Sequence, residues 1–88
     1  MRRVSIFGAT GSIGQNTIDL IARAPDEYEV VALSGGRNVA QLAEDAQRLG
    51  AAVAVTAFDE MLEPLRDALA GTGIEAQAGQ AALLEAAS

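Results

Sequence analysis

The 88-residue sequence contains no cysteine, no histidine and no tryptophan, and its six basic residues are all arginine. Without cysteine there is no disulfide, no thiol nucleophile and no cysteine-based zinc site. Without histidine there is no Ser-His pair and no histidine-bound metal. Without lysine there is no Schiff base and no Walker-type phosphate lysine. Most ways of building a self-contained catalyst are therefore excluded.

Aromatic residues and positive charges are also scarce. One tyrosine and two phenylalanines are too few for a platform on which nucleic-acid bases stack. The net charge of −6 leaves no basic surface of the kind that duplex DNA or anionic membranes need. No stretch approaches the ~20 apolar residues of a membrane span, and the start of the chain has no signal-peptide core. We therefore expect no nucleic-acid partner, no membrane partner and a cytoplasmic location.

Half of the residues are hydrophobic, and they follow alternating patterns. Short runs of β-branched and aromatic residues predict strands, whereas apolar residues at i, i+3, i+4 and i+7 predict amphipathic helices. Pro64 fits only the first turn of a helix, so the third helix is expected to begin near Glu63. The predicted strands are 4–7, 28–33, 51–55 and 74–78, and the predicted helices are 13–24, 39–49, 63–70 and 80–87.

This βαβαβαβα order with short connections predicts an α/β fold. The expected architecture is a Rossmann-like, doubly wound parallel sheet with right-handed crossovers and helices on both faces. Such folds normally have six strands in two halves, so four strands correspond to one half and the beginning of the next. The last predicted helix has no stop signal before Ser88. We therefore expect only about four strands of a larger domain.

A glycine-rich turn, Gly8-Ala9-Thr10-Gly11-Ser12-Ile13-Gly14, lies between the first strand and the first helix. Gly8 permits a tight turn, Gly11 lets the backbone approach a pyrophosphate, and Gly14 allows close packing of helix and strand. The helix N-terminus then faces the anion, and Thr10 and Ser12 can add hydroxyl donors. The pattern favours dinucleotide binding. In the alternative, the glycines serve turn and packing only, and Ser12 and Gln15 form a capping box.

The residues that follow the second strand, Ser34-Gly35-Gly36-Arg37-Asn38, indicate which dinucleotide is bound. A site for NAD usually has an Asp or Glu here, about 20 residues past the glycines, and none is present. Arg37 offers a forked cation to a 2′-phosphate, Gly35 and Gly36 let the backbone approach, and Ser34 can donate a hydrogen bond. NADPH is therefore favoured over NADH. In the alternative, Asn38 only caps the second helix, with Gln41 at N3, and Arg37 is a solvated charge.

The acidic residues look ordinary by comparison. Asp59, Glu60 and Glu63 lie at a predicted helix start, where acids suit the helix dipole. Solvated charge runs are common, so we expect neither a metal site nor a catalytic acid pair among these residues.

Two sets of residues resemble the 1-deoxy-D-xylulose 5-phosphate reductoisomerase family. The first is the turn at 8–14 followed by Thr-Ile-Asp-Leu-Ile at 17–21. The second is Val-Val-Ala-Leu at 30–33 running into Gly-Arg-Asn-Val at 36–39, and the tail from 73 to 82 is similar too. The glycine motif alone is shared with other reductases, such as aspartate-semialdehyde dehydrogenase, but its pairing with Gly-Arg-Asn-Val is more specific. The resemblance covers essentially all 88 residues.

The resemblance implies an NADPH-dependent, homodimeric, cytoplasmic enzyme of the non-mevalonate isoprenoid route. Such enzymes rearrange 1-deoxy-D-xylulose 5-phosphate and reduce the product to 2-C-methyl-D-erythritol 4-phosphate, with Mg²⁺, Mn²⁺ or Co²⁺ holding the phosphosugar substrate. The family's catalytic residues and metal ligands are expected beyond residue 88. The NADPH contacts that it implies fall on Thr10, Gly11, Ser12, Ile13, Gly36, Arg37 and Asn38. The glycine spacing and the loop after the second strand add Gly8 and Gly35 to these contacts.

Residues 1–88 are accordingly expected to be the amino-terminal part of an NADPH-binding Rossmann domain. The catalytic and carboxy-terminal domains are expected to be absent from this chain, and the 88 residues alone are expected to be inactive. Three alternatives stay open at this point. They are a reductase of the aspartate-semialdehyde dehydrogenase type with a downstream cysteine, a non-catalytic NADP-sensing module, and a scaffold domain that binds no nucleotide.

Overall fold

A computed structural model describes residues 2–8, 12–24 and 26–79, and for residues 12–14 the backbone only. Strands and helices alternate along this part of the chain, so the predicted α/β class is confirmed. The fourth predicted helix, 80–87, lies outside the described residues. The elements are β1 (Arg2–Ile6), α1 (Ser12–Ala22), β2 (Tyr28–Gly35), α2 (Val39–Leu49), β3 (Val53–Thr56), the 3₁₀ turn η1 (Asp59–Met61), α3 (Leu62–Ala68) and β4 (Glu75–Ala78).

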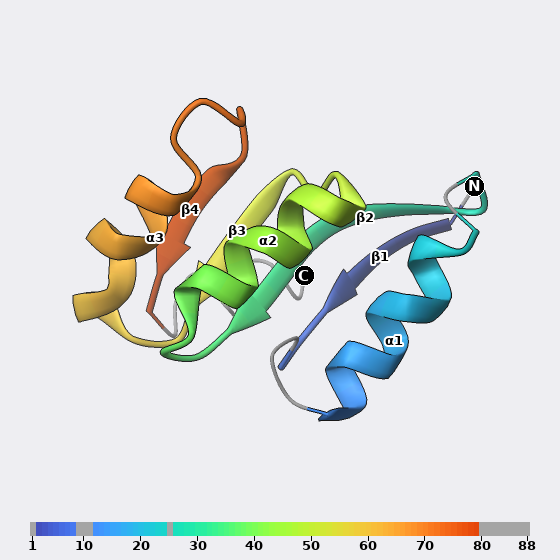
Figure 1. Ribbon diagram of the computed structural model, residues 1–88, viewed down its shortest axis with the longest axis horizontal. Coiled ribbons are helices and arrows are strands. Elements are labelled where there is room, and N and C mark those ends of the chain that lie inside the picture. Colours follow the sequence, from blue (N-terminus) through green and yellow to red (C-terminus); the bar gives the residue numbers. More distant parts are fainter. Residues whose placement is uncertain (1, 9–11, 25, 80–88) are drawn as a thin grey trace.

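The four strands form one sheet in the order β1-β2-β3-β4, and every neighbouring pair is parallel. Right-handed crossovers that step in one direction place their helices on the same face of a sheet. In agreement, α1 contacts α2 and α2 contacts α3, and Figure 1 shows α2 in front of the strands and α1 alongside β1. β4 lies beside β3 and extends the first half of the sheet, whereas the usual order places a fourth strand beside β1. A second layer of helices stays a prediction.

The hydrophobic core lies between these helices and the sheet. The helices contribute most of the apolar positions that their periodicity predicts, and β2 contributes a nearly continuous buried run, as expected of a strand inside a parallel sheet. Ile18 and Leu42 are fully buried, and Val39 and Leu49 pack at the margin. The buried core residues are Ile6, Ile18, Ile21, Val30, Leu33, Leu42, Ala43, Ala46, Ala51, Ala54, Leu65 and Leu69.

The first strand begins earlier than its apolar residues predict. Arg2 and Arg3 pair with Tyr28 and Glu29 of β2, although both arginine side chains are exposed. A β-ladder joins backbone groups, so exposed polar residues can extend it where the neighbouring strand continues. The apolar pattern reports side-chain burial and therefore misses this extension. It also places Phe7 in the strand, whereas β1 ends at Ile6.

A glycine lies at the end of α2, and a proline lies in the first turn of α3. Gly50 ends α2 with φ +65°, a left-handed conformation that glycine adopts without strain, and its N–H donates to the Gln47 carbonyl. α3 begins at Leu62, one residue before the predicted start at Glu63. Pro64 thus lies in the first turn, where a missing N–H removes no helical hydrogen bond. Within the described residues no helix has the length and hydrophobicity to cross a bilayer.

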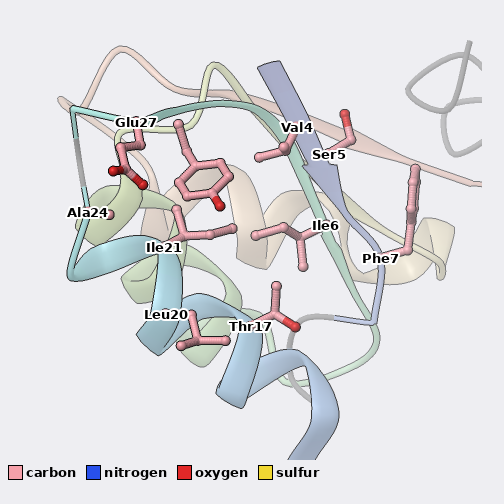
Figure 2. A pocket seen from close by; sticks show the side chains of 10 residues that line it. Val4, Ser5, Ile6, Phe7, Thr17, Leu20, Ile21, Ala24 and Glu27 are labelled. Carbon is pink, nitrogen blue, oxygen red and sulfur yellow. The ribbon is translucent and has the colours of Figure 1, made fainter. Parts of the chain in front are cut away.

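A pocket of about 600 Å³ lies between β1 and α1. Its lining is mostly apolar, and Figure 2 shows Ile6 of β1 and Ile21 of α1 pointing toward one another. Phe7 and Leu20 border it and are 49% and 67% exposed. Its described lining includes the carboxylate of Glu27 and no basic side chain, so a phosphate-bearing ligand finds no counter-charge there. A phosphate-bearing cofactor is therefore expected elsewhere on the molecule.

Candidate functional site

The carboxyl ends of the parallel strands meet at one edge of the sheet (Figure 1). The register pairs Ile6 with Leu33 and Gly35 with Thr56, so the residues after β1, β2 and β3 lie next to one another. Open parallel sheets bind ligands at this edge. The two loops that the sequence assigns to the cofactor are therefore neighbours, and the loop after β3 joins them.

Gly8 connects the glycine-rich turn to β2. Its φ of +71° lies in the left-handed region, which explains why glycine occupies the first position of the motif. Its N–H donates to Oγ of Ser34 over 3.1 Å. Ser34 is only 5% exposed, because it lies inside β2 and not in the loop beyond it. Ser34 therefore ties the two loops together, instead of facing the cofactor as the sequence suggested.

The structure describes only part of the remaining glycine-rich turn. Thr10 and Gly11 lie outside the described residues. α1 begins at Ser12, as the motif requires, and Ile13 belongs to its first turn. The first N–H groups of a helix have no partner within the helix, so they are available to an anion at this end. The contacts assigned to Thr10, Gly11, Ser12 and Ile13 stay predictions.

Asn38 caps α2. Its Oδ1 accepts a hydrogen bond from the Gln41 N–H over 3.2 Å, and its own backbone carbonyl accepts from Leu42. The predicted cap is thus confirmed. Because the cap uses the side-chain oxygen, the amide nitrogen is the part of Asn38 suited to an anionic ligand.

Arg37 projects from the end of β2 onto the loop after β3. Its Nη1 lies 3.0 Å from Oε1 of Glu60, and its guanidinium carbon lies 4.1 Å from the centre of the Phe58 ring. A guanidinium over an aromatic face is attracted to the ring and held in orientation by it. Arg37 is thus bound to two residues of the neighbouring loop, in contrast to the alternative of a merely solvated charge.

Glu60 is the negatively charged partner of Arg37. A backbone N–H hydrogen bond lowers the pKa of Glu60 below its ordinary value, and the Arg37 guanidinium lowers it further through a hydrogen bond and its charge. Glu60 is therefore ionised at neutral pH. Its side chain is 59% exposed and that of Arg37 is 62% exposed, so water and salt reach the pair.

Thr56, at the end of β3, connects the second and third loops. It is fully buried, and its hydroxyl donates to the Gly36 carbonyl over 2.9 Å and accepts from the Phe58 N–H over 3.3 Å. The Ala57 N–H also donates to the Gly35 carbonyl over 3.0 Å. These bonds fix Phe58 against Gly36 and beneath Arg37. The sequence patterns did not single out Thr56 or Phe58, and they assigned Glu60 to the helix dipole. Their position could have indicated a role in the site, since all three follow a predicted parallel strand and such positions lie at the ligand-binding edge of the sheet.

Asp45 links the helices that follow the two cofactor loops. It is 2% exposed, and its two oxygens accept hydrogen bonds from Nε2 of Gln15 in α1 over 2.7 Å and from Nε2 of Gln41 in α2 over 3.0 Å. Nearer the other ends of the helices, Arg48 pairs with Asp19 at 3.1 Å. The relative position of the two loops is therefore fixed by a buried carboxylate and an ion pair. The described residues contain no group of three or more metal-ligating side chains.

The sequence profile of 1-deoxy-D-xylulose 5-phosphate reductoisomerase matches residues 4–88. The chain belongs to this family. It is 74% identical over 86 residues to the reductoisomerase of Jannaschia sp. (strain CCS1) and 76% identical over 86 residues to that of Ruegeria pomeroyi. Each comparison covers 98% of this chain and 22% of the relative.

Solved reductoisomerase structures share the fold. The Zymomonas mobilis enzyme in complex with NADPH superposes with a TM-score of 0.96 at 51% identity, over 98% of this chain and 23% of that one. A reductoisomerase in complex with NADPH, fosmidomycin and magnesium gives 0.90 at 27% identity, over 99% and 22%. The Rossmann-like fold and the family are thus confirmed, and the alternatives based on the glycine motif alone are not favoured. The chain spans about a fifth of the length of these relatives.

Proposed function

We propose that this chain is the NADPH-binding part of a 1-deoxy-D-xylulose 5-phosphate reductoisomerase. The whole enzyme would rearrange its phosphosugar substrate and reduce it to 2-C-methyl-D-erythritol 4-phosphate, and bound NADPH would supply the hydride. One observation carries the proposal. Arg37 follows β2, whose Ser34 binds Gly8 of the glycine-rich turn, and it lies where sites for NAD have a carboxylate.

The residues at the sheet edge suit the two anionic parts of the cofactor. The turn that starts at Gly8 and the N-terminus of α1 would hold the pyrophosphate through backbone N–H groups. Arg37 would bind the 2′-phosphate through its charged fork, with the amide of Asn38 beside it. Gly35, which is the last residue of β2 and not part of the loop as the sequence predicted, and Gly36 would let the backbone come close to the ribose. The buried hydrogen bonds of Ser34 and Thr56 keep the loops in place for both contacts.

Further features of the whole enzyme are proposed from the family. They are a divalent metal, a homodimer and a cytoplasmic location. Support for the metal comes from the relative solved with NADPH, fosmidomycin and magnesium. The described residues offer no cluster of ligands that fits a metal ion, so we place the metal site in the other four fifths of the protein and derive no step through it.

The cofactor assignment can be tested by titrating the chain with NADPH and with NADH in a calorimeter. Arg37→Ala should weaken NADPH binding about ten- to hundredfold, the loss expected when one or two hydrogen bonds to a charged group are removed. NADH affinity should change less than threefold, since a ribose hydroxyl carries no charge for Arg37 to bind. Arg3→Ala is the matched control, because Arg3 lies near the amino end of β1, away from the loops at the carboxyl ends of the strands, and its ion pair with Glu29 is exposed. Equal losses for both cofactors would refute the role of Arg37.

The activity can be tested in a hybrid. This chain would replace the matching 86 residues of the Jannaschia relative, and the oxidation of NADPH would be followed with 1-deoxy-D-xylulose 5-phosphate and Mg²⁺. We expect turnover by the hybrid and none by the 88 residues alone. A folded hybrid that binds NADPH but does not oxidise it would contradict the proposal, and so would metal-dependent turnover by the chain alone.

A further inference from the structure

We propose that Glu60 is a specificity-determining residue that competes with the 2′-phosphate of NADPH for Arg37. In the cofactor-free protein Glu60 takes the place of the phosphate. On NADPH binding it releases the guanidinium, while Phe58 keeps the guanidinium at the site. This inference rests on the proposed function and deepens it, because it states what limits the preference for NADPH over NADH.

The geometry separates the two neighbours of Arg37 by the part of the guanidinium that they use. Phe58 contacts its flat face at 4.1 Å, whereas Glu60 binds an edge nitrogen, Nη1, at 3.0 Å. A phosphate also binds guanidinium edges, through two parallel N–H groups. Stacking on Phe58 is therefore compatible with a bound phosphate. Glu60 accepts from the same N–H groups at the edge of the guanidinium and keeps the guanidinium oriented toward its own carboxylate.

The exposure of the pair makes the exchange possible. Both side chains are more than half exposed, so the ion pair is weakened by solvent and by salt. A phosphate monoester carries a charge of about −1.5 to −2 and three acceptor oxygens, against a single charge on a carboxylate. The phosphate can therefore displace Glu60. Its net binding is reduced both by the ion pair that it breaks and by repulsion from the carboxylate that remains nearby.

Glu60 is the carboxylate that reaches Arg37 within the described residues. The side chain of the adjacent Asp59 lies against Gly79, which follows β4: its Oδ1 is 2.7 Å from the position that a Cβ on Gly79 would take. NADH leaves the Arg37–Glu60 pair intact, because its ribose hydroxyl has no charge to compete with Glu60. Glu60 should therefore lower the affinity for NADPH and leave the affinity for NADH unchanged.

The test is Glu60→Gln, titrated calorimetrically with NADPH and NADH at low ionic strength. NADPH affinity should rise about two- to fivefold, the range for one exposed ion pair, and NADH affinity should stay the same. Glu63→Gln is the matched control. It makes the same change in net charge, but Glu63 pairs with Arg66 at 2.9 Å and not with Arg37. NADPH affinity should change less than twofold in this control.

Two further variants show whether Glu60 acts through Arg37. In an Arg37→Ala background, Glu60→Gln should bring a clearly smaller gain in NADPH affinity, because only the repulsion between the carboxylate and the phosphate is then relieved. Phe58→Leu should weaken NADPH binding several-fold, because the guanidinium loses the ring that keeps it at the site. Circular dichroism would establish that each variant is folded.

Three outcomes would overturn the proposal. They are a loss of NADPH affinity in Glu60→Gln, an equal gain in Glu63→Gln, and a gain of the same size in the absence of Arg37. The first would show that Glu60 supports Arg37, and the other two would show a general effect of charge. An unmodified chain without saturable NADPH binding would refute the proposed function itself, and this inference with it.

Discussion

Asp45 should hold the two cofactor loops in register, and its replacement should weaken both folding and NADPH binding. Its carboxylate is almost completely buried and accepts hydrogen bonds from Gln15, near the start of α1, and Gln41, in the first turn of α2. Asp45→Ala would remove both bonds and leave two half-buried amide groups without their shared acceptor. Each amide belongs to a helix that begins at a cofactor loop, so the loss would be felt at both loops.

The expected magnitude follows from these contacts. A hydrogen bond to a charged group contributes about 1.5–3 kcal/mol, so two such bonds give about 3–6 kcal/mol. Alanine regains about 0.5 kcal/mol of helix propensity. Both glutamines are partly exposed, so water can replace part of what is lost. We therefore expect Asp45→Ala to lower the free energy of unfolding by about 2–4 kcal/mol.

Urea denaturation with and without saturating NADPH would measure this effect. Glu44→Ala is the control, since Glu44 is the exposed neighbour of Asp45 on α2. In Asp45→Asn, one glutamine amide can rotate to present its oxygen, so its cost should fall between those of the other two variants. The reasoning is refuted if Asp45→Ala destabilises the protein no more than Glu44→Ala does.

Two further predictions concern the loop after β3. Thr56→Val keeps the shape of the side chain but leaves the Gly36 carbonyl and the Phe58 N–H unpaired, so it should cost about 1–3 kcal/mol in urea denaturation. Thr56→Ser should cost much less, and equal costs would contradict the role of the hydroxyl. The pKa of Glu60 is lowered in the folded protein, so the stability that it contributes is complete above the pKa of the unfolded chain and is lost as the pH falls through the folded pKa. In a carboxyl NMR titration, Arg37→Ala should raise the Glu60 midpoint while leaving it below its ordinary value, since the backbone hydrogen bond remains. An unchanged midpoint would show that Arg37 does not stabilise the carboxylate.

The parts of the fold that the sequence predicts are those in which burial repeats along the chain. Ile18 and Leu42 are fully buried at positions that the helical period assigns to the core. Asn38 caps the start of α2 as predicted, and Gly50 caps its end, because capping depends on local backbone geometry and on the one residue that satisfies it. Both kinds of signal are contained in a few neighbouring residues.

The parts that the sequence did not predict depend on which strands are neighbours. Thr56, Phe58 and Glu60 enter the site because β3 pairs with β2, and this pairing brings the loop after β3 against Gly36 and Arg37. The sequence of residues 56–60 does not indicate which strand lies beside them. The acidic residues there are already explained by the helix dipole, so they do not suggest a binding site. Only the sheet order shows that Glu60 lies beside Arg37 and pairs with it.

The same sheet order is consistent with the proposal that this chain binds NADPH and that the 88 residues alone are inactive. Within the described residues, β1 pairs with β2 on one side only, and the apolar pocket with exposed Phe7 and Leu20 lies beside β1. In the usual doubly wound order, further strands lie beside β1, and a dinucleotide crosses the crevice at this reversal point. Under the proposed function, Arg37, which follows β2, would mark the adenosine side of the crevice. The reacting nicotinamide is then expected beyond the opposite side of β1, over strands that the other four fifths of the enzyme would provide.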